Sequence, residues 1–156
     1  MSTPFLSVIL PAHNEAERLP QSLHQVQQFI IQQPYECEVL VIENASTDDT
    51  AKVVKDFQAS FPQLGMIRLE QGGKGNAIQA GMQAAKGEYR FMADVDFSMP
   101  VEEIREFLPP YLNSPQVAIA SREQPGSKRI GEPFYRHLIG RVFNLLVQIL
   151  VLPDLQ

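Results

Sequence analysis

The sequence predicts an α/β fold in which a mostly parallel central sheet is covered by helices on both faces. Short apolar, β-branched runs alternate along the chain with segments whose apolar residues recur every three or four positions. The runs are nearly continuous in apolar residues, as expected of strands that are buried on both faces. With 156 residues, 44% of them hydrophobic, the chain is long enough for one domain around one core.

The first half of the chain contains two strand–helix pairs. An apolar run at 5–10, which Pro11 closes, predicts the first strand, and a similar run at 38–42 predicts the next. The Ser-Thr-Asp-Asp sequence at 46–49 is typical of a helix start, because hydroxyls cap free N–H groups and carboxylates favour the first turn. The helix between the two strands is indicated by apolar residues at spacings of four, three and four: Leu19, Leu23, Val26 and Ile30.

The second half of the chain continues this alternation. Its expected elements, in order, are a strand at 66–69, a small-residue helix at 77–85, a strand at 89–93, a helix that Pro100 begins and a strand at 117–120. A polar stretch with Gly and Pro at 122–133 predicts a loop that leads into a last helix.

Polar residues directly follow four of the predicted strands. The carboxyl ends of parallel strands share one edge of a sheet, and ligands of such folds bind there. We therefore expect a binding site built from the segments 11–15, 43–46, 94–98 and 121–122.

Two carboxylates, Asp94 and Asp96, follow the run at 89–93, and Ser98 lies two positions further on. In an extended segment, residues two apart point the same way, so both carboxylates face one hard cation such as Mg²⁺ or Mn²⁺. The alternative is that these acids cap the helix that Pro100 begins. The position at the edge of the sheet favours the metal site.

A glycine-rich turn, Gly72-Gly73-Lys74-Gly75, leads into the small-residue helix. The free N–H groups at the helix start and the Lys74 ammonium favour contact with a phosphate. The turn is not a P-loop, because neither Ser nor Thr follows the Gly-Lys pair, and a plain tight turn is the alternative. The segment 11–15 also leaves two interpretations open, namely ligand contact and helix capping by Asn14.

Charge and composition limit the classes of partner. The net charge of −5 argues against a general nucleic-acid binder. From Arg122 onward, five basic residues face three acidic ones, and an apolar stretch follows at 138–150, which fits an interfacial helix on a membrane and equally a core helix with solvated arginines. The lone Cys37 and a start without a signal peptide predict a cytoplasmic setting, and no apolar run is long enough to cross a membrane.

Four segments, taken in order, resemble the family 2 inverting glycosyltransferases, whose nucleotide-sugar-binding α/β fold is called GT-A. The segments are VILPAHNEAERL, VLVIENASTDDT, GGKGNAIQAGMQAAKGEYRFMADVDFS and VAIASRE. The combination of GKGNA, DVDFSMP, a Ser-Arg pair and R-x-x-x-x-R-x-F-N at 136–144 is most similar to the polyprenyl- or dolichyl-phosphate glucosyltransferase branch, with the mannosyl relatives next. The resemblance implies a Rossmann-like sheet and transfer of a hexose, glucose from UDP-glucose, to a polyprenyl or dolichyl phosphate.

The resemblance also assigns roles to residues. The expected catalytic residues are Asp94, Asp96, Arg122 and Arg136, with the two arginines on the acceptor phosphate. The expected donor-binding residues, with Lys74 added for its phosphate contact, are Pro11, Ala12, Glu15, Glu43, Asn44, Lys74 and Asp94. The expected metal ligands are Asp96, Asp94 and Ser98, holding Mg²⁺ or Mn²⁺. In the family, a pair of aspartates stands where this chain has Glu43 and Asn44, and Asn44 still offers an amide to a uracil edge.

The family pattern divides the domain into a nucleotide-sugar-binding core at 1–121 and, at 122–156, a basic loop and an apolar, interfacial helix on the acceptor side. Family members continue beyond this point, which implies a C-terminally truncated chain. The implied partners are a nucleotide-sugar donor, a polyprenyl or dolichyl phosphate, the inner surface of a membrane and a second copy of the chain, but no nucleic acid.

Three alternatives stay open at this point. The first is a glycosyltransferase that uses GDP-mannose or a saccharide acceptor, and the hydroxyl of a saccharide acceptor would need a carboxylate base. The second is a non-catalytic module that binds nucleotide sugars. The third is a haloacid-dehalogenase-type phosphatase, in which Asp94 is the nucleophile and Asp96 the acid and base.

Overall fold

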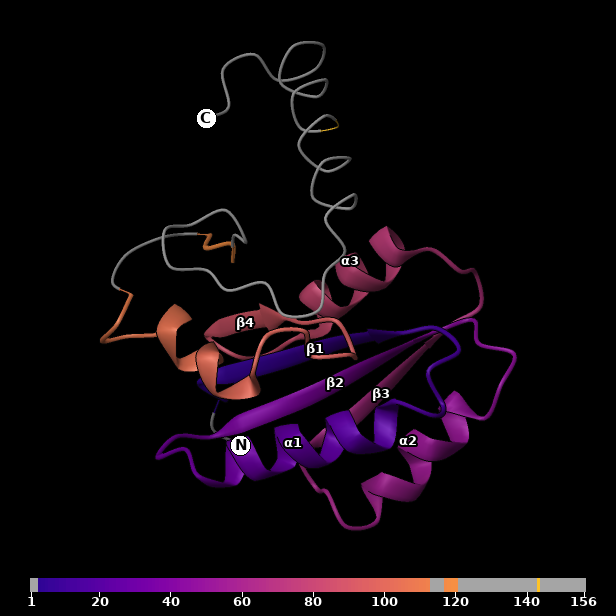
Figure 1. The fold of residues 1–156 in the computed structure, drawn as a ribbon, viewed down its shortest axis with the longest axis horizontal. Helices are drawn as coiled ribbons and strands as arrows, with labels where there is room; N and C mark the ends of the chain where they lie inside the picture. Colours follow the sequence, from indigo (N-terminus) through magenta and orange to yellow (C-terminus); the bar gives the residue numbers. More distant parts are fainter. Residues whose placement is uncertain (1–2, 113–116, 121–142, 144–156) are drawn as a thin grey trace. The chain divides into compact units, whose positions relative to one another are not determined.

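The computed structural model describes residues 3–112, 117–120 and 143. The chain divides into two compact units, at 1–115 and 116–156, and most of the described residues belong to the first. In that unit strands and helices alternate, as Figure 1 shows: β1 (Leu6–Ala12), α1 (Leu19–Ile31), β2 (Cys37–Asn44), α2 (Thr50–Gln58), β3 (Leu64–Leu69), α3 (Lys74–Ala84), β4 (Tyr89–Met92) and the 3₁₀ helix η1 (Val101–Phe107).

The four strands form one parallel sheet in the order β3-β2-β1-β4. Its register brings the carboxyl ends of the two central strands level, because Ala12 of β1 pairs with Glu43 of β2. The expectation of a mostly parallel sheet is thereby confirmed. The loops that follow β1, β2 and β4 consequently leave the sheet at the same edge.

Helices cover both faces of the sheet (Figure 1). Successive side chains of β1 point to opposite faces, so Val8 and Leu10 are buried on the side of α1 and η1, while Ile9 is buried on the side of α3. The larger core cluster joins β1 and β2 to apolar side chains of α1 and η1, among them Leu23 and Ile104. This two-sided burial explains why the strands carry almost continuous apolar runs.

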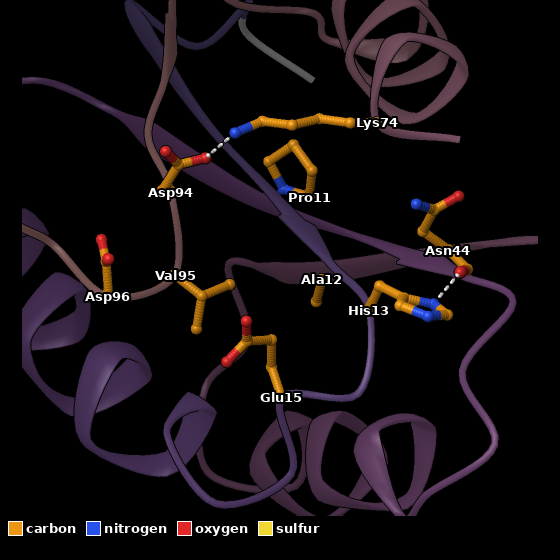
Figure 2. Close-up of a pocket in the computed structure, with 9 residues that line it drawn as sticks. All are labelled: Pro11, Ala12, His13, Glu15, Asn44, Lys74, Asp94, Val95 and Asp96. Atoms are coloured by element: carbon orange, nitrogen blue, oxygen red, sulfur yellow. Dashed lines mark hydrogen bonds and ion pairs between the residues drawn. The ribbon is translucent and has the colours of Figure 1, made fainter. Parts of the chain in front are cut away.

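Helix α3 approaches the sheet through its small residues. Ala77 and Gly81 are both buried, and they face Ile9 and Ile42 of the sheet. The helix begins at Lys74, three residues before the expected start, because Gly73 takes a φ of 146° and ends the preceding turn there. Lys74 is therefore the first residue of α3 and lies at the carboxyl edge of the sheet (Figure 2).

Two expected elements differ in the structure. The helix after Pro100 is the 3₁₀ helix η1, and residues 117–120 form no strand. Val117 and Ile119 are 78% and 84% exposed. An apolar β-branched run becomes a strand only if another strand pairs with it, and the local sequence carries no information about that partner.

The loop at 122–133 and the last helix lie outside the described residues. In the part of the chain that the structure does describe, every helix is too short or too polar to span a bilayer.

Candidate functional site

A pocket of about 240 Å³ opens at the carboxyl edge of the sheet (Figure 2). The ends of β1 and β2, the first residue of α3 and the loop after β4 contribute its walls. Its lining residues are Pro11, Ala12, His13, Glu15, Asn44, Lys74, Asp94, Val95 and Asp96. The structure thus brings together residues from three of the four segments in which the sequence places a site.

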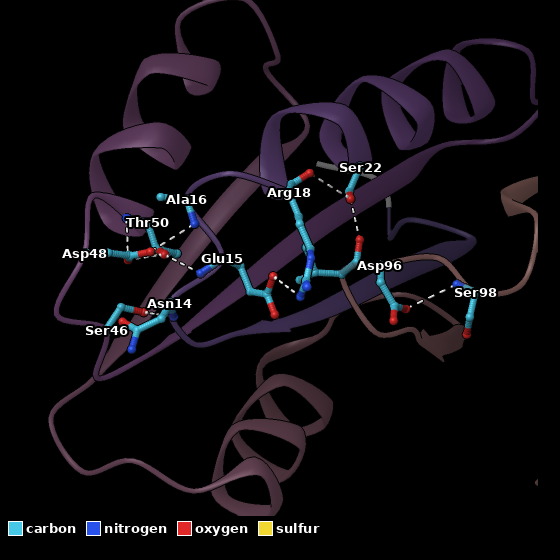
Figure 3. Close-up of polar contacts among 11 residues, drawn as sticks. Asn14, Glu15, Ala16, Arg18, Ser22, Ser46, Asp48, Thr50, Asp96 and Ser98 are labelled. Atoms are coloured by element: carbon cyan, nitrogen blue, oxygen red, sulfur yellow. Dashed lines mark hydrogen bonds and ion pairs between the residues drawn. The ribbon is translucent and has the colours of Figure 1, made fainter. Parts of the chain in front are cut away.

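The loops after β1 and β2 are tied together beside this pocket (Figure 3). Oδ1 of Asn14 accepts a hydrogen bond from the Thr47 N–H at 2.8 Å, and Oγ of Ser46 accepts one from the Asn14 N–H at 3.1 Å. The Thr50 hydroxyl accepts a third, from the Glu15 N–H at 2.9 Å. Asn14 therefore connects the two loops and does not cap the following helix, which was the alternative. Its backbone has a φ of 55°, and the hydrogen bonds of its side chain and of its N–H stabilise this conformation.

Asp48 holds both the second loop and the start of α2. Its Oδ1 accepts hydrogen bonds from the N–H and the hydroxyl of Thr50, at 2.9 and 2.5 Å, and its Oδ2 accepts one from the Ala16 N–H at 3.1 Å (Figure 3). These hydrogen bonds, above all the one from the Thr50 hydroxyl, lower the pKa of Asp48. Within the expected helix start at 46–49, Asp48 is therefore the residue whose side chain caps the helix, while Asp49 makes no side-chain capping bond.

Asp48→Asn is expected to lower the melting temperature at neutral pH, because the amide accepts weaker hydrogen bonds than the carboxylate. Since folding lowers the pKa of Asp48, the stabilisation by its charge is present above the unfolded value of about 3.9 and disappears as the pH falls through the folded value. The difference in melting temperature between the wild type and the variant should shrink below about pH 4. Thermal melts between pH 7 and pH 2.5 measure it, with Asp56→Asn on α2 as the control. A difference that is independent of pH would contradict the prediction.

Asn44 connects the pocket to the start of α3. Its Oδ1 accepts a hydrogen bond from the Gly73 N–H at 3.0 Å, and its backbone oxygen lies 2.7 Å from Nδ1 of His13. A carbonyl oxygen only accepts, so Nδ1 of His13 carries the proton. The Asn44 side chain is thereby fixed at the pocket wall, with an NH₂ group as its donor.

Opposite Asn44, the pocket is lined by two carboxylates and an ammonium group. Nζ of Lys74 lies 2.8 Å from Oδ1 of Asp94, and the two side chains are 65% and 55% exposed. An ion pair this exposed contributes little to stability. A bound anion can therefore replace Asp94 as the partner of Lys74 with little loss of free energy. Asp96 is also exposed, and its Oδ1 accepts a hydrogen bond from the Ser98 N–H at 3.2 Å.

The turn that carries these carboxylates is anchored to α1. The Ser22 hydroxyl donates a hydrogen bond to the backbone oxygen of Val95, whose side chain is buried. Asp94 and Asp96 flank this fixed residue, and both line the pocket.

The donor set fits a hard cation that arrives with a phosphate. Within the described residues, no group of three or more His, Cys, Asp or Glu side chains is placed to hold a metal on its own. Asp94 and Asp96 nevertheless offer two exposed carboxylates at one pocket, and Mg²⁺ commonly uses one or two carboxylates and completes its shell with phosphate oxygens and water. The residues therefore fit Mg²⁺ or Mn²⁺ together with a diphosphate.

Several expected site residues lie away from this pocket. Glu43 is fully buried outside the lining, and Ser98 contacts Asp96 through its backbone N–H. Arg122 and Arg136 are outside the described residues. The sequence interpretation did not assign His13, although this residue stands within the polar segment that ends the first strand.

Comparison with known proteins places this chain in a family. A protein-family model described as glycosyl transferase family 2 matches residues 7–149. Among curated proteins, a dolichol-phosphate mannosyltransferase from Pyrococcus furiosus is 29% identical over 87% of this chain and 38% of its own length. A dolichyl-phosphate beta-glucosyltransferase from Trichomonas vaginalis is 28% identical over 93% of this chain and 48% of its own.

A solved structure has the same architecture. The mannosyltransferase PcManGT from Pyrobaculum calidifontis, in complex with GDP-Man and Mn²⁺, matches 66% of this chain and 30% of its own, with 28% identity and a TM-score of 0.55. The predicted GT-A fold is thereby confirmed, and the family match favours glycosyl transfer over the haloacid-dehalogenase alternative. The chain spans less than half the length of the two curated relatives. It belongs to glycosyl transferase family 2.

Proposed function

We propose that this protein transfers a hexose from a nucleotide sugar to a polyprenyl or dolichyl phosphate with inversion at the sugar carbon. The observation that carries the proposal is the meeting of Asn44, Lys74, Asp94 and Asp96 at one pocket. These side chains offer a base-recognising amide, a cation for the diphosphate and two metal ligands. The relatives named as dolichyl-phosphate and dolichol-phosphate glycosyltransferases support the choice of acceptor.

UDP-glucose is the donor that we propose first. The chain resembles the glucosyl branch in its motifs, and the Asn44 amide offers an NH₂ donor to a uracil oxygen. GDP-mannose is the competing donor, since a mannosyltransferase stands among the relatives and another among the solved structures.

Charge neutralisation is the main task of the site. Asp96, with Asp94 beside it, would hold the Mg²⁺ or Mn²⁺ ion, which supplies positive charge to the diphosphate leaving group when bound. Lys74 would exchange its contact with Asp94 for one with the diphosphate, which also frees the Asp94 carboxylate. Asn44 would orient the base, so that the sugar carbon lies beyond the carboxylates.

The acceptor needs orientation more than activation. A phosphate is already anionic at neutral pH, so no strong general base has to remove a proton from it. Arg122 and Arg136 would hold this phosphate in line with the sugar carbon. The role of the two arginines stays a prediction. The same holds for a peripheral position at the cytoplasmic face of a membrane and for a homodimer.

Isothermal titration of UDP-glucose and of GDP-mannose, each with and without Mn²⁺, tests the proposal. Metal-dependent binding of UDP-glucose is the expected result, and metal-dependent binding of GDP-mannose would change the donor but keep the site. Transfer is then assayed with a polyprenyl phosphate. Binding without any transfer would favour a non-catalytic module, and binding of neither donor would contradict the proposal.

Lys74→Met is expected to weaken the binding of UDP with Mn²⁺ by about tenfold, because one charge-assisted contact with the diphosphate is lost. The variant keeps an apolar stem of similar length at the start of α3. Lys86→Met, an exposed lysine just past the other end of this helix, is the control and should bind as the wild type does. Equal affinities of the two variants would show that Lys74 does not contact the diphosphate.

A further inference from the structure

Glu43 is a carboxylate at the end of β2 that is buried completely. Its Oε1 accepts a hydrogen bond from the Ser46 N–H at 2.5 Å. Its Oε2 forms an ion pair with Arg68 on β3, whose Nε lies 3.0 Å away. Among the described residues, this Oε2 accepts no hydrogen bond. A buried charge is costly unless it is paired, so this arrangement needs both partners.

The turn that Glu43 spans contains Asn44, which lines the pocket. Between Glu43 and Ser46 the chain passes through Ala45, whose φ of 53° is in the left-handed region that residues with a Cβ rarely adopt. A hydrogen bond that the Glu43 carboxylate accepts from the N–H three residues later closes this strained turn. The buried carboxylate thus fixes the backbone on both sides of Ala45.

Residues of the same turn make three hydrogen bonds at or beside the pocket. The Asn44 backbone oxygen accepts from His13, the Asn44 side-chain oxygen accepts from the Gly73 N–H, and the Ser46 hydroxyl accepts from the Asn14 N–H. A turn that changed its conformation would release all three together.

We infer that Glu43 is a positioning residue, which acts on the nucleotide through the turn at 44–46 and not by touching it. The inference rests on the proposed function and deepens it. Arg68, on the neighbouring strand β3, balances the buried charge of Glu43. The pair of Glu43 and Arg68 therefore determines how well Asn44 and His13 present their polar groups to a base.

The opposing interpretation is direct contact between Glu43 and the nucleotide. Direct contact predicts that a change at Glu43 alters ligand affinity but leaves the ligand-free turn as it is. The positioning role predicts that the ligand-free turn loosens first. Amide hydrogen exchange at Ser46, measured by NMR without ligand, separates the two.

Glu43→Gln is the test variant, because it keeps the size of the side chain but turns an amide donor or a neutral oxygen toward the Arg68 guanidinium. Exchange of the Ser46 amide in the ligand-free protein is expected to become about tenfold faster, and the affinity for UDP with Mn²⁺ about tenfold lower. Pyrophosphate with Mn²⁺, which has no base, should lose less affinity than UDP does, since Asp94 and Asp96 belong to the loop after β4 and only Lys74 follows the Gly73 contact.

Glu38→Gln provides the matched control. Glu38 lies on the same strand and accepts hydrogen bonds from the Ser7 hydroxyl and the Lys86 N–H, both at 2.5 Å, but at the opposite end of the sheet. Its replacement is expected to lower the melting temperature without changing nucleotide affinity. A loss of affinity in Glu38→Gln equal to that in Glu43→Gln would mean general destabilisation and would overturn the inference.

Arg68→Gln keeps the test decisive if Glu43→Gln does not fold, because the Arg68 side chain is largely exposed. Like Glu43→Gln, it should speed the exchange of the Ser46 amide and lower the affinity for UDP, each by a smaller factor, and wild-type values for both would overturn the inference. The inference would also be overturned if Ser46 exchange were unchanged in a folded Glu43→Gln, or if this variant lost as much affinity for pyrophosphate as for UDP. If the wild type binds neither UDP nor GDP, the proposed function fails, while the exchange measurement still tests the turn.

Discussion

Asp96→Asn is expected to abolish the Mn²⁺-dependent part of nucleotide-sugar binding, a loss of about 100-fold or more in affinity. The amide keeps an oxygen that accepts the hydrogen bond from the Ser98 N–H, so the turn keeps its conformation. Only the charge at the pocket wall is removed. Titration of the donor with and without Mn²⁺ measures the effect directly.

Glu102→Gln is the control for this variant. Glu102 is an exposed acid in the first turn of η1, and it does not line the pocket. It should retain the full metal dependence of binding. If Asp96→Asn also retained it, the cation would have to be held elsewhere, and the assignment of Asp96 as a metal ligand would be wrong.

Gly81→Ala is expected to destabilise the protein by about 2 kcal/mol, although alanine normally stabilises a helix relative to glycine by about 1 kcal/mol. A Cβ at this position would lie 2.4 Å from Cγ2 of Ile9 and 3.0 Å from Cγ1 of Ile42. Neither isoleucine can move away, because both are fully buried in the sheet. Helix α3 would have to shift outward, and Lys74 would shift with it.

Gly75→Ala is the matched substitution on the same helix. Nothing lies within 4 Å of the Cβ that it would add, so it should be neutral or stabilise by up to about 1 kcal/mol. Urea denaturation of the two variants measures the difference. A Gly81→Ala protein as stable as the wild type would mean that α3 does not pack as closely as the structure has it.

Much of this fold follows from local patterns. The alternation of apolar runs with amphipathic segments gives the order of strands and helices up to β4, and two-sided burial gives a parallel sheet. The first and last residues of each strand and helix are harder to predict from the sequence, because they depend on contacts with other elements. β3, for example, begins at Leu64, two residues before the expected start, where it pairs with Val39 of β2.

The candidate site could be located from the sequence but not built from it. The rule that ligands bind at the carboxyl edge of a parallel sheet places Asp94, Asp96 and Asn44 near one another without further input. The orientation of Glu43 could not be predicted, because it depends on Arg68, a residue that becomes its neighbour only through the pairing of β2 with β3. The bond between Asn14 and Thr47 likewise joins two loops that are distant in sequence.

The late position of β4 along the chain means that the two sides of the pocket are synthesised at different times. β1 lies between β2 and β4, so its first residue, Leu6, pairs both with Cys37 and with the much later Tyr89. A nascent chain that has left the ribosome as far as α3 already contains Asn44 and Lys74. The carboxylates come with β4, whose pairing closes the longest loop in the sheet and pays the largest entropy of closure. The side of the pocket with Asn44 and Lys74 is thus synthesised before the side with Asp94 and Asp96.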